Sequence, residues 1–168
     1  MCMGCLLEQA PHLISKEYAM KLVTLQTTKL KRHTKDPQML HSAQRPCALI
    51  VRLKYRGDRY DFAVPMRSNI PPAAPKHEYF ALPPRPKTKP HHHHGLHYIK
   101  MFPVDISWTL PFYTSGNVYA AMIKGVIDSK EKQIVAECQK YLTRYETGYR
   151  SDYSTDLDYL ITLVPKRK

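Results

Sequence analysis

Residues 47–66 read CALIVRLKYRGDRYDFAVPM, and this stretch decides the fold class. Its first half, Cys47–Tyr55, changes from a continuous apolar run to alternation of apolar and polar residues. Its second half, Arg59–Met66, alternates again, and the RGD sequence at residues 56–58 between the halves is a turn sequence. The pattern therefore predicts a β-hairpin of two antiparallel strands.

Shorter patterns on both sides of the hairpin predict two more strands and two loops. Residues 20–27 (MKLVTLQT) and 95–104 (GLHYIKMFPV) are apolar enough for strands that enter the core. Residues 30–44 are polar and basic, which predicts a loop with at most a short helix. Residues 69–90 contain seven prolines, so we expect a long functional loop with little regular structure.

The last third of the chain changes to a helical period. Apolar residues spaced three and four apart predict two consecutive helices, over about residues 117–127 and 129–147. Asp128 and Glu131 stand three residues apart, as in a capping box at the start of the second helix. Residues 156–164 fit either a helix or a strand. Strands followed by helices predict an α+β protein.

Length and composition exclude several classes of protein. With 168 residues, 43% of them hydrophobic and 24% charged, the chain fits one compact globular domain. We assign that domain to residues 20–168 and interpret residues 1–19 as an N-terminal extension outside it, because Met20 offers a second start. No apolar run approaches the roughly 18–20 residues of a membrane span, so we expect no membrane partner and a cytoplasmic protein. The scattered cysteines, with a single C-x-x-C at Cys2 and Cys5, favour reduced thiols over disulfides or a metal site.

The excess of positive over negative charge is confined to the middle of the chain. The whole protein carries 26 Lys and Arg against 14 Asp and Glu. Residues 20–104 hold sixteen basic and four acidic residues, a net +12, whereas residues 1–19 and 105–168 nearly balance. A localised basic surface favours a polyanionic partner, and nucleic acid is the leading candidate. The alternative is an ordinary basic protein with no nucleic-acid role.

Five histidines stand close together near residue 95. His91–His94 are consecutive, and His97 follows. Imidazole tracts bind divalent metals, but adjacent side chains on a loop form no defined coordination set, and no Asp, Glu or Cys stands nearby at ligand spacing. A solvated loop is therefore the favoured interpretation, and we expect no metal site here.

Polar and basic residues gather at the open end of the predicted hairpin. The second strand ends in Arg67-Ser68-Asn69, which offers a cation, a hydroxyl and an amide to a phosphate. Arg45 precedes the first strand, and His41 lies four residues upstream. In an antiparallel hairpin the start of the first strand lies beside the end of the second, so these residues should meet at one edge. The alternative is an ordinary polar turn capped by its own serine or asparagine.

Three segments match, in order, the sequence pattern of a known family. They are MKLVTL at Met20, RPCALIV with YDFAVPMRS in the hairpin, and GLHYIKMFPV at Gly95. The helical segment YAAMIKGVIDSKEKQIVAECQKYL is also similar in spacing to the paired C-terminal helices of that family. Over about residues 20–164 the chain therefore resembles the ToxN/AbiQ endoribonuclease toxins of type III toxin-antitoxin systems.

The resemblance implies both a fold and a reaction. The fold would be α+β, a strongly twisted antiparallel β-sheet with surrounding helices, like that of the Kid/MazF-type toxins. The reaction would be RNA cleavage without a metal or other cofactor, in which the 2′-hydroxyl attacks its adjacent phosphodiester and leaves a 2′,3′-cyclic phosphate. The protein would then have to move protons and stabilise charge on a phosphorane-like transition state.

Family residues carry over to the hairpin edge with departures on both sides of the serine: Arg67 replaces a threonine or serine, and Asn69-Ile70 replaces Pro-Lys. Ser68 falls on the serine of the family motif, and Arg45 falls on the basic residue before the first strand. Ile70 stands where the motif has its lysine, so either Arg67 substitutes for that lysine or the chain is a diverged member with altered or lost cleavage. The resemblance thus implies catalytic roles for Arg45 and Arg67 in phosphate stabilisation, for Ser68 in orienting the phosphate, and for His41 or His97 in proton transfer.

The implied partners are RNAs. They are a small structured RNA antitoxin, repeated in tandem in its precursor, and cellular RNA substrates, with a protein-RNA hetero-oligomer as the assembly and phage defence as the role. The basic residues expected to bind RNA are Lys29, Lys31, Arg32, Arg52, Lys54, Arg85, Lys87, Lys89 and Lys100. Aromatic residues interleaved with them could stack on bases or belong to the core: Tyr55, Tyr60, Tyr79, Phe80 and Tyr98. A non-catalytic RNA-binding protein of the same fold is the alternative function.

Overall fold

The computed structural model describes residues 20–33, 35–40 and 45–168. The predictions for residues 1–19 (the extension and its C-x-x-C sequence) and for His41 lie outside these described residues. Within them, no helix is both long and apolar enough to cross a membrane.

One antiparallel sheet forms the centre of the molecule. Its seven strands follow the order β4-β5-β3-β2-β1-β7, with β6 paired to β3 beside this path, and every pairing is antiparallel. The strands are β1 (Met20–Leu25), β2 (Cys47–Tyr55), β3 (Asp58–Ile70), β4 (Tyr79–Leu82), β5 (His93–His97), β6 (Phe102–Pro103) and β7 (Thr109–Pro111). The α+β class with an antiparallel sheet, predicted from the sequence, is confirmed.

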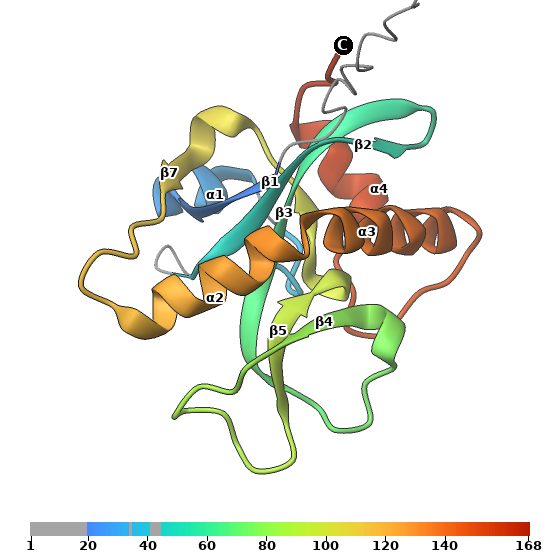
Figure 1. Ribbon diagram of the computed structural model, residues 1–168. Helices are drawn as coiled ribbons and strands as arrows, with labels where there is room; N and C mark the ends of the chain where they lie inside the picture. The colour runs from blue at the N-terminus through green and yellow to red at the C-terminus, as the bar shows by residue number, and fades with distance from the viewer. Residues whose placement is uncertain (1–19, 34, 41–44) are drawn as a thin grey trace, which may run out of the picture.

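The predicted hairpin is confirmed as β2 and β3, which Figure 1 shows as a long, curved pair of strands. Gly57, with φ of 81°, supplies the left-handed backbone conformation that the tight turn requires. The second strand is longer than predicted, because β3 continues through residues 67–69 to Ile70 and pairs there with β5. Between Arg67 and Ile70 the register shifts, so that two residues of β3 oppose one of β5. The polar Arg-Ser-Asn stretch is therefore part of a bulged strand and not a turn.

The segments that follow the hairpin contain short regular elements that the sequence does not indicate. The proline-rich segment 69–90 is irregular over most of its length, as expected, but it contains a 3₁₀ turn, η1 (Lys76–Glu78), and the strand β4. The strand expected over 95–104 is divided into β5, a second 3₁₀ turn, η2 (Tyr98–Lys100), and β6. Strand β4 pairs with β5 so closely that a Cβ on Gly95 would overlap the carbonyl oxygen of Phe80. This close approach requires glycine in β5.

Both predicted helices are present. Their bounds, with those of the short elements, are α1 (Thr27–His33), η3 (Ile106–Trp108), α2 (Val118–Ser129), α3 (Glu131–Glu146), α4 (Leu157–Leu160) and η4 (Ile161–Leu163). The predicted capping box is wrong, because Asp128 belongs to the last turn of α2 and the N-cap of α3 is Lys130, which makes no side-chain cap. The helix pair begins instead at Asn117, whose side chain accepts a hydrogen bond from the N–H of Ala120.

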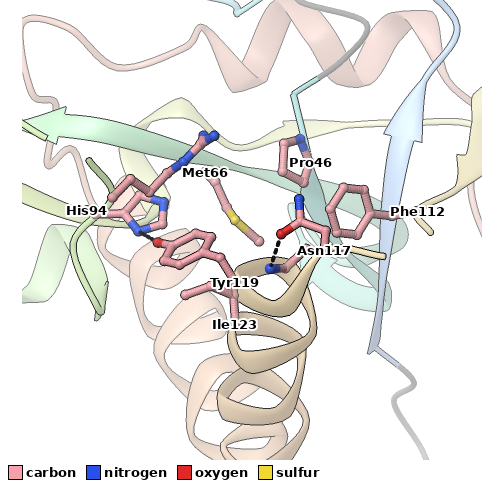
Figure 2. A pocket seen from close by; sticks show the side chains of 9 residues that line it. Pro46, Met66, His94, Phe112, Asn117, Tyr119 and Ile123 are labelled. Atoms are coloured by element: carbon pink, nitrogen blue, oxygen red, sulfur yellow. Dashed lines mark hydrogen bonds between the residues drawn. The ribbon is translucent and has the colours of Figure 1, made fainter. Parts of the chain in front are cut away.

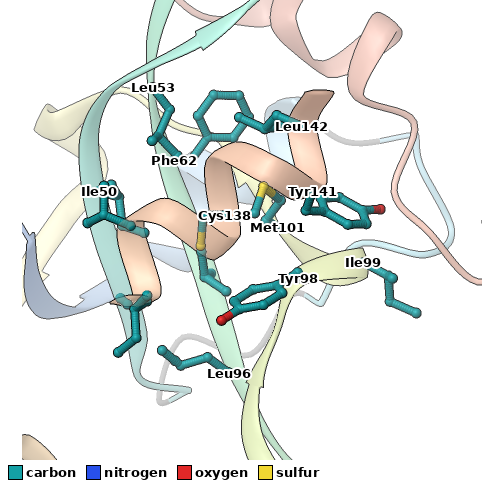
Figure 3. Packing of buried hydrophobic residues seen from close by; sticks show 14 of the residues in the cluster. Ile50, Leu53, Phe62, Leu96, Tyr98, Ile99, Met101, Cys138, Tyr141 and Leu142 are labelled. Carbon is teal, nitrogen blue, oxygen red and sulfur yellow. The ribbon is translucent and has the colours of Figure 1, made fainter. Parts of the chain in front are cut away.

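Helices α2 and α3 lie across one face of the sheet and leave the edge around β4 and β5 extending beyond them (Figure 1). Figure 3 shows how α3 packs Cys138, Tyr141 and Leu142 against hydrophobic side chains of the strands. Of the aromatic residues considered for base stacking, Tyr55, Tyr60, Tyr79 and Tyr98 are buried, and only Phe80 is partly accessible. The core therefore uses these four tyrosines. Cys47 and Cys138 are buried free thiols.

Candidate active site

Segments far apart in the chain meet around one pocket of about 540 Å³. The turn η1, strand β5 and the turn η2 contribute the buried polar residues Glu78, His97 and Lys100, and β3 contributes the half-buried Arg67. The loop after α3 contributes the half-buried Ser151 and the exposed Tyr153 at the rim. The lining residues are Gln38, Arg67, Pro71, Ala73, Ala74, Glu78, His97, Ile99, Lys100, Ser151 and Tyr153. A pocket of this size falls in the range of small-molecule and nucleotide sites.

Arg67 and His97 form a hydrogen-bonded pair in this pocket. Because Arg67 lies opposite Gly95, two residues before His97, the two side chains share one face of the sheet. Arg67 Nη1 lies 3.1 Å from Nδ1 of His97. A guanidinium only donates, so Nδ1 accepts, and the proton of the neutral imidazole is on Nε2. That Nε2 is buried and has no partner among the described residues.

The environment of His97 keeps its imidazole neutral. The side chain is 2% exposed, and burial lowers its pKa to about 3, with the charges of Arg67 and Lys100 acting in the same direction. His97 therefore presents an N–H donor at neutral pH and does not exchange protons there. The acid/base role considered for His97 from the sequence would require a pKa closer to the working pH than about 3.

Lys100 is the titratable cation of the pocket. It is 5% exposed, and its Nζ donates to Oε1 of Gln38 at 2.7 Å and to the carbonyl oxygen of Gln38 at 3.2 Å. Burial, followed by the positive charge of Arg67, lowers its pKa to about 8, and Asp36 opposes the shift. The Asp36 carboxylate also accepts the N–H groups of Gln38 and Asp156, which fixes the loop that holds the ammonium.

Arg45 and Arg67 lie together at the hairpin edge, as strand pairing requires. Arg45 Nη1 donates a hydrogen bond of 2.8 Å to the carbonyl oxygen of Met66, and Met66 is the residue before Arg67. The pKa of Arg67 is lowered by burial and by the positive charge of Arg45. Two guanidinium groups held this close favour an anion between or beside them.

Ser68 lies beside this cluster in the bulge of β3. It is half-buried, and its hydroxyl makes no hydrogen bond with any residue that the structure describes. Bulges often re-aim side chains next to active sites. Ile70, at the position of the family lysine, is fully buried in the core, so the cations of the site come from Arg67 and Lys100. His41 lies outside the described residues.

Glu78 is a pocket residue that sequence reasoning missed. Its side chain is 4% exposed and accepts a hydrogen bond of 2.6 Å from the hydroxyl of Tyr149, whose pKa this contact raises to about 12. Glu78 is the only acidic residue between Asp61 and Asp105 in the sequence, and this isolation in a basic stretch could have identified it. No sequence pattern, by contrast, brings Gln38 or Tyr153 to this pocket.

The residues predicted to bind RNA divide into near and distant groups. Lys89 is near, because its N–H donates to Oδ1 of Asn69 in the bulge at 2.8 Å. Lys54 is distant, because it pairs with Arg59 of β3. Arg59 precedes Arg67 by eight residues, and eight residues of extended strand span roughly 25 Å. In full, Arg52 and Lys54 are exposed on the far end of β2, Lys29 is exposed on α1, Arg85, Lys87 and Lys89 are exposed after β4, and Lys100 is buried in the pocket. Lys31 and Arg32 belong to α1, and their side chains are outside the described set.

A second, smaller pocket of about 160 Å³ lies between the strands and the start of α2 (Figure 2). Its polar groups already have partners. His94 Nδ1 lies 2.8 Å from the carbonyl oxygen of Pro83, and the hydroxyl of Tyr119 donates to the same oxygen at 2.8 Å. Arg85 stands over the ring of Tyr119, 5.9 Å from its centroid. We interpret these contacts as the attachment of the loop after β4 to α2.

The histidine tract is spread over both faces of β5. His93 stacks on Tyr79 with ring centroids 5.1 Å apart, whereas His94 faces the smaller pocket. Strand alternation thus separates neighbouring imidazoles. Among the described residues no group of three or more His, Cys, Asp or Glu side chains is arranged to hold a metal ion.

Comparison with known proteins gives the fold a precedent. No protein-family model and no curated protein matches the sequence. A structure of AbiQ, a lactococcal anti-phage endoribonuclease of a type III toxin-antitoxin system, superimposes with a TM-score of 0.61. It is 12% identical, over 86% of this chain and 95% of AbiQ. This chain has the AbiQ fold.

Two further structures share the AbiQ fold. One belongs to a type III toxin-antitoxin system whose toxin is selectively inhibited by a non-coding RNA pseudoknot, with a TM-score of 0.62, 14% identity and coverage of 86% of this chain and 95% of that chain. The other belongs to a bacterial antiviral system regulated by a processed non-coding RNA, with a TM-score of 0.61, 12% identity and coverage of 84% and 95%. The fold expected from the resemblance is thereby confirmed.

Proposed function

We propose that this protein is an endoribonuclease toxin that cleaves RNA through its own side chains and is neutralised by a structured RNA. The observation that carries the proposal is the Arg67–His97 pair beside Lys100 in a pocket of about 540 Å³. The AbiQ fold supports it, because AbiQ itself is an endoribonuclease. Residues 20–168 form the toxin domain in this proposal, and the cytoplasm is its location.

The scissile phosphate binds between the half-buried Arg67 and the buried Lys100. Arg67 donates to one non-bridging oxygen with the N–H groups that His97 leaves free, and the Nε2–H of His97, which lacks a partner among the described residues, donates to a second. Arg45 adds positive charge behind Arg67. These donors are already in place, so they stabilise the extra negative charge of the phosphorane without reorganisation. Ser68, in the adjacent bulge, orients the phosphate.

Lys100 supplies the proton transfer. With a pKa of about 8, a useful fraction of its amine is neutral near physiological pH and accepts the proton of the RNA 2′-hydroxyl. The 2′-oxygen then bonds to phosphorus and the bond to the 5′-oxygen breaks. The leaving 5′-oxygen takes a proton from water, and the Lys100 ammonium returns its proton to the solvent, which gives a 2′,3′-cyclic phosphate and a 5′-hydroxyl. Arg67 and Lys100 both repel a divalent cation, and this repulsion supports direct binding of the phosphate by the protein.

The same charge supports an RNA antitoxin as partner. Residues 20–104 hold the entire net +12, and the exposed lysines after β4 lie on the loop that Asn69 anchors beside the pocket. The related structure with an inhibitory RNA pseudoknot provides the precedent. An antitoxin RNA bound to this surface covers the pocket and forms a hetero-oligomer with the protein. During phage infection the RNA dissociates, and the toxin is released.

The test is cleavage of RNA by the protein and by a version starting at Met20, with and without EDTA, with the product ends identified. We expect 2′,3′-cyclic phosphate ends in both buffers. Lys100→Met should reduce cleavage about 10²- to 10⁴-fold, and Arg67→Ala about 10²- to 10³-fold. Lys140→Ala, which removes an exposed lysine of α3 that has no assigned role in RNA binding, should stay within about two-fold of wild type.

Thermal unfolding of each variant separates loss of chemistry from loss of fold. If the wild type cleaves no RNA, or if the folded Lys100 and Arg67 variants cleave as fast as wild type, this site is not the active site. The burial of Ile70 at the family lysine position favours one second candidate, a non-catalytic RNA-binding protein. That alternative predicts tight RNA binding by wild type with no cleavage in either buffer.

A further inference from the structure

Tyr153 stands out among the lining residues of the catalytic pocket because it is exposed. Its side chain is 66% accessible, while Arg67, His97 and Lys100 lie deeper in the same pocket. The ring lies at the rim of a cationic pocket with an accessible face, and its hydroxyl makes no hydrogen bond within the part of the chain that the structure describes.

The loop that carries Tyr153 is held firmly. The N–H and hydroxyl of Ser154 both donate to the carbonyl oxygen of Ser151, which closes a tight turn with Tyr153 inside it. Thr155 then anchors the turn, because its N–H donates to the carbonyl oxygen of Ile99 at 2.9 Å and its hydroxyl to that of Met101 at 2.5 Å. Ile99 is the neighbour of Lys100, so the backbone that carries the ring of Tyr153 is fixed relative to the turn of the proposed catalytic lysine.

We propose that Tyr153 is the stacking platform for a nucleobase next to the scissile phosphate. This inference rests on the proposed function, since it assigns the base subsite of the same pocket. An RNA whose phosphate is bound by Arg67 must place a flanking base near the rim, and a pocket of about 540 Å³ has room for more than a phosphate. Base stacking on an aromatic ring is sequence-tolerant, because every base has a π-face.

Burial makes the assignment selective. The tyrosines of the basic segment, Tyr55, Tyr60, Tyr79 and Tyr98, are part of the core and cannot receive a base. Tyr113 is as accessible as Tyr153, at 78%, but does not line this pocket. Tyr113 is therefore a matched control within the same chain, because replacement of this exposed tyrosine should not affect the affinity for RNA.

The experiment measures binding without cleavage. The probe is an oligoadenylate of 2′-O-methyl nucleotides, which lacks the attacking hydroxyl, and its binding to the full chain is measured by fluorescence anisotropy. Tyr153→Ala should weaken binding about 5- to 150-fold, as loss of one stacked base predicts. Tyr153→Phe keeps the ring and should stay within about two-fold of wild type, as should Tyr113→Ala.

An abasic oligonucleotide of the same length tests whether the ring acts through a base. Wild type and Tyr153→Ala should bind this probe equally, because only phosphate contacts remain. Equal binding of oligoadenylate by wild type and Tyr153→Ala overturns the inference, and so does an equal loss with the abasic probe or in Tyr113→Ala. If wild type cleaves no RNA but Tyr153→Ala still loses base-dependent binding, the proposed catalysis fails and the base subsite stands.

Discussion

Lys100 should make the stability of the protein depend on pH in a measurable way. Its pKa falls from 10.5 in the unfolded chain to about 8 in the folded protein, because burial and the charge of Arg67 disfavour the ammonium. Between these two values the unfolded state binds one more proton than the folded state. The free energy of unfolding therefore rises as the pH increases from about 8 to about 10.5, and below pH 8 the full penalty is present.

Replacement of Lys100 by methionine removes this dependence while keeping the length of the side chain. Integration of the two titrations gives a penalty of about 3 kcal/mol at pH 7 and about 1 kcal/mol at pH 10. Between pH 7 and pH 10, the free energy of unfolding of wild type should therefore rise by about 2 to 3 kcal/mol relative to that of Lys100→Met. This difference holds whatever the variant loses at Gln38, because those lost hydrogen bonds shift its stability by the same amount at each pH.

Urea denaturation at half-unit steps between pH 6.5 and pH 10 provides the measurement, with wild type and variant in the same buffers. Lys87→Met, which removes an exposed ammonium, is the matched control and should follow the wild-type curve. If the curves of wild type and Lys100→Met run parallel within about 0.5 kcal/mol, Lys100 is not a desolvated cation. The proton-transfer role assigned to it would then lose its physical basis.

Three further outcomes follow from single contacts. The ring resonances of His97 should keep their neutral positions from pH 8 down to about pH 4, since its pKa is about 3, and an NMR midpoint near 6.5 would contradict its burial. Gly95→Ala should destabilise the fold by about 3 kcal/mol because of the overlap with the carbonyl of Phe80, whereas Gly125→Ala, in open space within α2, should stabilise it by about 0.5 to 1 kcal/mol in the same denaturation assay. Asn117→Ala should lower stability by about 1 kcal/mol through loss of the α2 cap, and Asn117→Ser should restore most of it.

Regular periodicity made much of the fold predictable. The hairpin and the two long helices follow from alternation and from helical spacing, because each element buries one continuous face. Strand β4 was missed because its four residues lie in a proline-rich segment and are specified by pairing with β5. The capping box was wrong because α2 continues through Asp128, and local spacing does not show where a preceding helix ends.

The candidate site was predictable only where strand pairing determines it. Pairing across the hairpin brings Arg45 to Arg67, and this much follows from the sequence. The burial that lowers the pKa of Lys100 does not follow from the sequence. A lysine in a basic stretch is expected at the surface, and only the fold shows that the loop at Gln38 covers it. Tyr153 reaches the pocket through the attachment of Thr155 to η2, a contact between segments more than fifty residues apart.

The order in which the pocket walls are synthesised has a consequence for the cell that makes the protein. Strand β3 and the turn η2 emerge from the ribosome well before the loop of Ser151 and Tyr153, and the Asp36 carboxylate that steadies Gln38 also binds the N–H of Asp156. Domains acquire their structure only as the contacting segments become available during synthesis. A nascent or truncated chain that stops before residue 151 lacks the wall of the pocket that Ser151 and Tyr153 form. Under the proposed function, the RNA site therefore stays incomplete until translation of the domain is nearly finished.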